Sequence, residues 1–108
     1  MMPEHEKTRY AWAVIFTSRR TGNAEGYEAM DRALTKAVES QPGFLGIESI
    51  STGARSLTVS YWDSLESIRL WRENPLHREA QALGRRRWYS AYRIQVCRVE
   101  REYAFDAD

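Results

Sequence analysis

The amino-acid sequence predicts a single α+β domain of the ferredoxin-like kind, with the element order β-α-β-β-α-β and a mainly antiparallel sheet. Three observations predict it. Short runs rich in aromatic and β-branched residues alternate with stretches of helical periodicity. Turn signals at 41–43, 52–55 and 74–75 separate these pieces. The length of 108 residues suits one domain.

Residues 10–18 are short, aromatic and β-branched, which predicts the first strand. Both alternating faces of this strand are apolar, so we expect it to be covered on both sides. Asn23 then offers a helix cap. Apolar side chains follow at the spacing of one helical stripe: Tyr27, Met30, Leu34, Ala37 and Val38. The Gln-Pro-Gly sequence at 41–43 ends this helix.

The next two strands form a predicted hairpin. Residues 44–51 and 57–62 read as strands, and 52–55 reads as the turn between them. On the second of these strands one face carries Leu57, Val59 and Tyr61.

Two helices and a strand complete the predicted domain. Asp63 and Glu66 resemble a capping box that opens a short helix. Asn74, followed by a proline, starts a third helix that runs to about Trp88. A long final strand is predicted over 89–103, in which Tyr92, Ile94 and Val96 alternate.

This arrangement predicts a homodimer. Helices collect on one face of such a sheet, yet the first strand needs cover on both faces. A second copy of the chain would supply the missing cover, packed sheet to sheet about a two-fold axis.

Composition narrows the class of partner and the compartment. Sixteen basic and fifteen acidic side chains give a net charge of +1, which indicates neither a nucleic-acid nor a membrane-surface protein. The single cysteine, Cys97, allows no internal disulfide and fits the reducing cytoplasm. No signal peptide or membrane span is evident. We place the domain at 8–104 and expect 1–7 and 105–108 to be flexible termini.

One face of the third helix carries candidate chemistry. His77, Gln81, Gly84 and Trp88 fall on it, and His77 is the only histidine inside the predicted domain. Histidine titrates near neutral pH and serves as acid, base or ligand. The alternative is a half-exposed His77 without a role. The tryptophans likewise read either as pocket walls or as core. No nucleophile, P-loop or dinucleotide motif is present.

Four segments together resemble the antibiotic biosynthesis monooxygenase family: 41–46, 60–71, 75–77 and 84–89. The resemblance extends over roughly 12–103. It implies a dimeric α+β barrel with a pocket in each subunit between the sheet and the helices. Family members include cofactor-independent oxygenases of aromatic polyketides and haem-degrading monooxygenases, so the resemblance implies an oxidoreductase.

The haem-degrading branch of that family has an asparagine on the first strand, a tryptophan on the second helix and a histidine ligand on the third. In this sequence the three positions fall on Val14, Trp71 and Gln81, so only the tryptophan matches. His77 lies one turn before Gln81, about 6 Å away by helix geometry. It would serve as a displaced ligand only if the haem also moved.

Three hypotheses follow. The first is a monooxygenase that needs no cofactor and oxidises a small electron-rich aromatic, a phenol or quinol, with molecular oxygen. His77 would accept the proton, and the substrate-binding residues would be Trp62, Trp71, Gln81, Trp88 and Tyr92. The second is a haem-binding or haem-degrading monooxygenase that uses His77. The third is a non-catalytic dimer that binds a small ligand or a partner.

Overall fold

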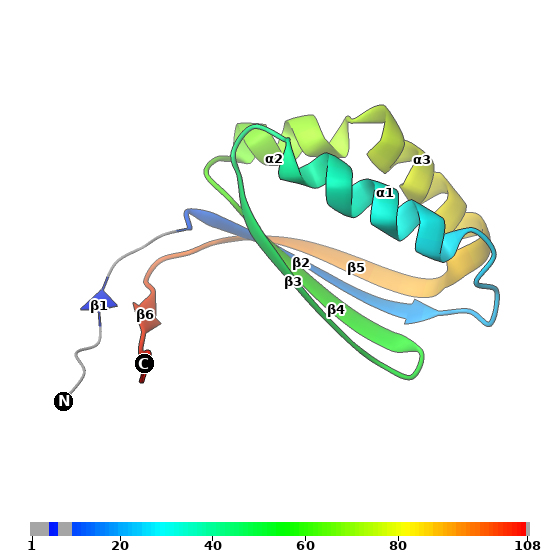
Figure 1. Cartoon of the computed structure of the whole chain (residues 1–108), viewed down its shortest axis with the longest axis horizontal. Coiled ribbons are helices and arrows are strands. Elements are labelled where there is room, and N and C mark those ends of the chain that lie inside the picture. Colours follow the sequence, from blue (N-terminus) through cyan, green and yellow to red (C-terminus); the bar gives the residue numbers. More distant parts are fainter. Residues whose placement is uncertain (1–4, 7–9, 108) are drawn as a thin grey trace.

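The computed structural model describes residues 5–6 and 10–107. A four-stranded antiparallel sheet has the strand order β3-β4-β2-β5, and all three α-helices lie on one of its faces (Figure 1). The strands of this sheet are β2 (Trp12–Arg20), β3 (Phe44–Thr52), β4 (Arg55–Trp62) and β5 (Tyr89–Arg98). The helices are α1 (Tyr27–Glu39), α2 (Leu65–Arg72) and α3 (Pro75–Leu83), and α3 continues into the π-helical turn η1 (Gly84–Trp88). The predicted ferredoxin-like α+β fold is confirmed.

The strand register fixes which side chains share a face. Val14 on β2 lies opposite Ser60 on β4 and Val96 on β5, and the next row toward the hairpin contains Phe16, Thr58 and Ile94. These side chains face the helices. Alternate residues, such as Ile15 and its partner Val59, point away from the helices. Leu57, Val59 and Tyr61 share this outer face, as the alternation predicts.

Two predicted helix caps are wrong. Ser64, not Asp63, caps α2, because its hydroxyl accepts a hydrogen bond from the backbone N–H of Ser67 at 3.1 Å. The Asp63 carboxylate instead accepts from the Ser67 hydroxyl at 2.8 Å. Asn23 closes a turn with the N–H of Glu25, and the chain enters α1 through Gly26 at φ 78°. That left-handed backbone is one that glycine adopts without strain.

The start of α3 agrees with the sequence. The Asn74 side chain accepts hydrogen bonds from the N–H groups of Leu76 and His77, and Pro75 occupies the first turn. The helical path reaches Trp88 as predicted, but its last five residues form the π-helical turn. A Cβ on Gly84 would lie 2.8 Å from the Tyr89 ring, so the absence of a side chain there lets Tyr89 pack closely.

The final strand is shorter than predicted. β5 ends at Arg98, and the chain reaches a separate two-residue strand, β6 (Tyr103–Ala104), which pairs with β1 (His5–Glu6) away from the main sheet (Figure 1). Near its start β5 carries a bulge, because Arg19 pairs with Ala91 and Arg20 with Tyr89. The bulge turns Tyr89 and Tyr92, three residues apart, to the same inner face.

Most of residues 1–7, one of the two predicted flexible termini, lie outside the described residues. The described part of the chain contains no helix long and apolar enough to cross a membrane.

Candidate active site

A cavity of about 510 Å³ lies between the inner face of the sheet and the helices. All four strands of the main sheet contribute to its floor, and side chains from α1, α2 and α3 form its roof. His77, Trp71, Trp62, Gln81 and Tyr92 are among its lining residues. The structure thus brings five of the six predicted site residues to one cavity.

His77 is the titratable base of this cavity. Its imidazole lies against the Trp71 indole, with ring centroids 4.9 Å apart, and its Nδ1 is buried without a hydrogen-bond partner. Burial lowers the pKa of His77, and the Arg72 carbonyl acts in the opposite direction. The imidazole is therefore neutral at pH 7 and able to accept a proton.

Hydroxyl groups line the floor beneath. Ser49 and Thr58 share a hydrogen bond of 2.6 Å across β3 and β4. The Trp62 indole N–H donates to the Ser60 hydroxyl at 2.9 Å, which leaves the hydroxyl hydrogen of Ser60 free to donate elsewhere. A ligand in the cavity therefore meets hydroxyl groups on the floor, among apolar side chains such as Val14 and Phe16.

A basic and phenolic cluster closes the other end. The Arg20 guanidinium stacks over the Tyr27 ring, 3.4 Å from its centroid. Tyr89 pairs with Arg20 in register, and burial raises the pKa of Tyr89 well above its ordinary value, so its phenol stays protonated. Arg20 and Tyr89 were not predicted as site residues. Alternation from Val14 and Phe16 would have put Arg20 on the inner face if the predicted strand had extended beyond Ser18.

Gln81 and Tyr92 occupy different parts of the wall. Gln81 is partly buried on α3. Tyr92 lies on the edge strand β5 with 37% of its surface exposed, and its hydroxyl accepts a hydrogen bond from Arg85 at 3.2 Å. Both side chains carry the hydrogen-bonding groups expected of them, and Tyr92 stands where the cavity reaches the sheet edge.

The tryptophans divide into wall and support. Trp71 and Trp62 line the cavity, although Trp62 is only 1% exposed. Trp88 is 2% exposed and does not line the cavity. Its indole N–H donates to the Glu25 carbonyl at 2.8 Å, and its ring packs edge-on against Tyr27. The π-helical turn changes the spacing on which a shared face with His77 depends. Trp88 anchors the loop before α1.

The residues of this cavity do not fit the haem arrangement that the family resemblance implies. Gln81 lines the wall at the ligand position, and an amide is not among the usual axial ligands of haem iron. The His77 ring is packed against Trp71.

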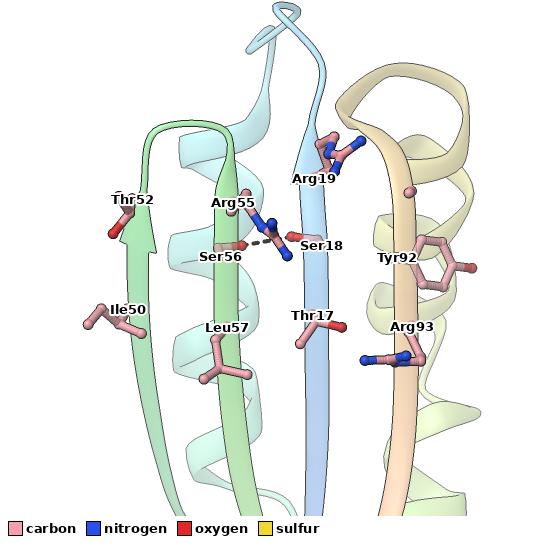
Figure 2. Close-up of a pocket in the computed structure, with 11 residues that line it drawn as sticks. Thr17, Ser18, Arg19, Ile50, Thr52, Arg55, Ser56, Leu57, Tyr92 and Arg93 are labelled. Atoms are coloured by element: carbon pink, nitrogen blue, oxygen red, sulfur yellow. Dashed lines mark hydrogen bonds between the residues drawn. The ribbon is translucent and has the colours of Figure 1, made fainter.

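A second, more open hollow of about 580 Å³ lies on the outer face of the sheet, near the β3–β4 hairpin. Figure 2 shows Arg55 and Arg93 pointing in toward β2 from the strands on either side, with Arg19 toward the end of β2. No acidic side chain lines this hollow, and none of the three guanidinium groups forms an ion pair with a described residue. Its floor includes Leu57 and Ile50, of which Ile50 is 66% exposed.

Comparison with known proteins identifies relatives in sequence and in structure. The family described as Antibiotic biosynthesis monooxygenase matches residues 13–83. The protein YqjZ of Bacillus subtilis (strain 168), itself uncharacterized, is 43% identical over 96 residues, which cover 87% of this chain and 83% of YqjZ.

Among solved structures, one similar fold is that of SnoaB from Streptomyces nogalater, a cofactor-independent oxygenase. Its TM-score is 0.71 at 12% sequence identity, and the aligned part covers 84% of this chain and 94% of the SnoaB chain. Rv0793 from Mycobacterium tuberculosis has a TM-score of 0.72 at 14% identity, with coverage of 90% and 98%. At these identities the structural likeness establishes a shared fold.

Proposed function

The chain belongs to the antibiotic biosynthesis monooxygenase family, and we propose, from this membership and from the inner cavity, that it is a cofactor-independent monooxygenase. Its substrate would be a small electron-rich aromatic compound. One observation carries the proposal: His77 presents a buried, unbonded imidazole nitrogen beside an aromatic wall in the main cavity. A neutral base that faces the bound substrate is what removal of a phenolic proton requires. SnoaB, of the same fold, is a cofactor-independent oxygenase.

The proposed reaction needs no outside reductant. A phenol with a free para position loses its O–H proton to His77, and the phenolate ring gives electrons to O₂. One oxygen atom becomes the new ring carbonyl and the other leaves as water, so phenol and O₂ yield quinone and H₂O. The four electrons come from the substrate. The para C–H bond breaks and leaves its electrons with the ring as the carbonyl forms. Its proton and the one that the His77 imidazolium returns convert the departing oxygen to water. Trp71 and the rest of the aromatic wall exclude bulk water.

The positions of the other lining residues support this assignment. Gln81 and Tyr92 provide hydrogen-bonding groups on the wall, and Ser60 provides one on the floor. Trp62 and Trp71 give flat surfaces on which an aromatic ring stacks.

We also propose that the protein works as a homodimer in the cytoplasm, closed sheet to sheet through the outer face. Ile50 and Leu57 on that face are 66% and 37% exposed, and a domain of this size gains from covering such surface. The arginine-lined hollow marks the hairpin end of the apolar band (Figure 2). The free thiol of Cys97 fits a reducing compartment.

Oxygen uptake by the metal-free, flavin-free protein tests the catalytic proposal. A panel of phenols and naphthols with a free para position is offered to the wild type and to His77→Gln. The glutamine fills a similar volume with an amide that does not act as a base. We expect turnover of at least one compound and a loss of about 10²- to 10⁴-fold in the variant, the usual contribution of a general base. Uptake no faster than in protein-free buffer for the whole panel would favour the non-catalytic dimer. A saturable Soret band on haem titration, lost in His77→Ala, would favour the haem-binding alternative.

A further inference from the structure

We propose that the cavity takes a substrate with an acidic group at the end opposite to its oxidised ring, and that Arg20 binds this acidic group. The inference rests on the proposed function, in which the inner cavity is the substrate site. It names a class of substrate: elongated aromatic acids, in place of simple neutral phenols.

Arg20 is held in the cavity by the backbone on both sides. It is the last residue of β2, its N–H donates to the Ala54 carbonyl at 2.6 Å, and the bulge in β5 sets Tyr89 opposite to it. The guanidinium plane rests on Tyr27. Stacking of this kind fixes an arginine while leaving its N–H groups along the edge of the plane available.

Those N–H groups lack an acceptor. The Nε of Arg20 is buried without a hydrogen-bond partner, and the guanidinium forms no ion pair with a described residue. Buried donors in proteins are nearly always satisfied, and a planar guanidinium matches a carboxylate with two parallel hydrogen bonds. A ligand oxygen at this position would supply the missing acceptor.

The charges around the cavity favour an anion at this end. Among the described residues that line the cavity, Asp31 on α1 is the only acidic one. Its exposed carboxylate helps to raise the pKa of Tyr89 but forms no ion pair with Arg20. The Tyr89 phenol opposite Arg20 is hydrogen-bonded to Tyr27 and stays protonated, so it adds no negative charge. Arg72 and His77 belong to the other end.

The two ends are far enough apart to set the length of the ligand. β4 ends just before α2 begins, and β2 ends at the opposite end of the sheet, where the chain enters β5 (Figure 1). His77 follows α2 on the next helix, whereas Arg20 is the last residue of β2 and pairs with Tyr89 at the start of β5. Val14 and Arg20 on one face of β2 are about 20 Å apart at strand spacing. A ligand that reaches both ends therefore carries its acid several bonds away from the ring that reacts.

A matched pair of fluorescent probes tests the inference without turnover. The anionic probe is 8-anilino-1-naphthalenesulfonate, and the neutral probe is N-phenyl-1-naphthylamine, the same ring system without the sulfonate. Each is titrated into the wild type, Arg20→Gln and the control Arg19→Gln, whose side chain leaves the neighbouring position toward the outer face.

We expect the wild type to bind the sulfonate at least about tenfold more tightly than the neutral probe. Arg20→Gln should weaken sulfonate binding about 10- to 100-fold, the range for a hydrogen bond to a charged group, and leave the neutral probe unchanged. Arg19→Gln should change neither affinity. If Arg20→Gln does not fold, Arg20→Lys should weaken the sulfonate alone by about threefold or more, because lysine lacks the planar fork.

Equal affinities of the wild type for the two probes, or no binding of either, would overturn the inference. So would a loss of sulfonate affinity in Arg19→Gln and not in Arg20→Gln. His77→Gln separates this inference from the proposed function. It should keep the sulfonate preference, so a protein that binds the sulfonate through Arg20 and consumes no oxygen would refute the monooxygenase proposal alone.

Discussion

The two faces of the sheet are built from the same four strands and differ in what covers them. Helices roof the inner face and enclose the cavity with His77 at one end and Arg20 at the other. On the outer face Ile50 and Leu57 remain exposed, and the arginines that line the hollow there form no ion pair within the described part of the chain. Neighbouring residues on one strand thus belong to different surfaces, as Arg19 and Arg20 do.

This difference indicates a division of labour. The inner face holds every titratable or aromatic group to which we assign chemistry. The outer face has apolar side chains on its two central strands, Ile15 on β2 and Leu57 and Val59 on β4, with charged side chains beside them on the edge strands, Glu48 on β3 and Arg93 on β5. An apolar centre with a polar rim is the pattern of an association surface. Substitutions on one face should therefore change assembly, and those on the other should change ligand binding or stability.

The largest effect is expected from a charge on the outer face. Val59→Asp places a carboxylate in the middle of the proposed interface, opposite Ile15. Because each dimer would bury two unpaired charges, we expect the association constant of the dimer to fall about a thousandfold or more. Sedimentation equilibrium should show the 12.6 kDa species for the variant and twice that mass for the wild type. Leu65→Asp, at the 52% exposed start of α2, is the control and should stay dimeric. A wild type that sediments only at 12.6 kDa would refute the dimer.

On the inner face, Trp62→Ala should have the largest effect on stability. The Trp62 side chain is 1% exposed, packs edge-on against Phe44 and donates a hydrogen bond to Ser60. We expect the free energy of unfolding to fall by about 3–5 kcal/mol in urea denaturation, as for other buried tryptophans. Trp71→Ala, at the partly exposed wall, should lower the free energy of unfolding by less than Trp62→Ala does. It should weaken the binding of the naphthalene probes by more. Equal losses of stability in the two variants would contradict the division into support and wall.

The π-helical turn provides a smaller effect. Gly84→Ala puts a methyl group 2.8 Å from the Tyr89 ring, which must move away from its place opposite Arg20. We expect a loss of about 1–3 kcal/mol in thermal or urea unfolding, the cost of overpacking. Gly22→Ala, where nothing lies within 4 Å, is the matched control and should not destabilise. Unchanged stability in Gly84→Ala would show that Tyr89 has room to move.

The smallest effect is a dependence of stability on pH. Because burial lowers the pKa of His77, the unfolded chain binds a proton more readily than the native protein. The contribution of His77 is therefore fully present above the unfolded pKa of about 6.5 and is lost as the pH falls from there toward the lower native pKa. In that window the free energy of unfolding should fall by at most about 1.4 kcal/mol per pH unit. His77→Gln should remove this part of the slope, and an identical slope in both proteins would contradict a buried neutral imidazole.

Local signals in the sequence predicted most of the fold. These signals depend only on residues that are neighbours in the chain, and each corresponds to a feature of the structure. They are the strand patterns of 10–18 and 57–62, the hairpin turn at 52–55 and the cap at Asn74. The predicted cap of α2 was wrong because Asp63 and Ser64 are both adequate capping residues, and the sequence does not choose between them. The predicted cap of α1 was wrong because the chain enters that helix through the left-handed Gly26, without a side-chain cap.

The site was harder to predict because it depends on contacts between distant segments. The helical wheel brought His77 and Gln81 to one face correctly, but it treated η1 as a regular α-helix and so included Trp88. Arg20 was missed because its role arises from its stacking on Tyr27 and from the bulge in a strand about 70 residues later. A pattern within a single segment carries no information on such contacts.

In the proposed reaction, the protein inserts one oxygen atom of O₂ into a phenolic substrate in the inner cavity without a cofactor. The most direct measurement is mass spectrometry of the product formed under ¹⁸O₂ by metal-free, flavin-free protein, compared with His77→Gln and with protein-free buffer. We expect each turnover to give a quinone with one ¹⁸O atom and one ¹⁸O-labelled water molecule. The wild type should form this quinone far faster than His77→Gln. A product that carries no ¹⁸O, or labelled product formed equally fast by both proteins, would contradict it.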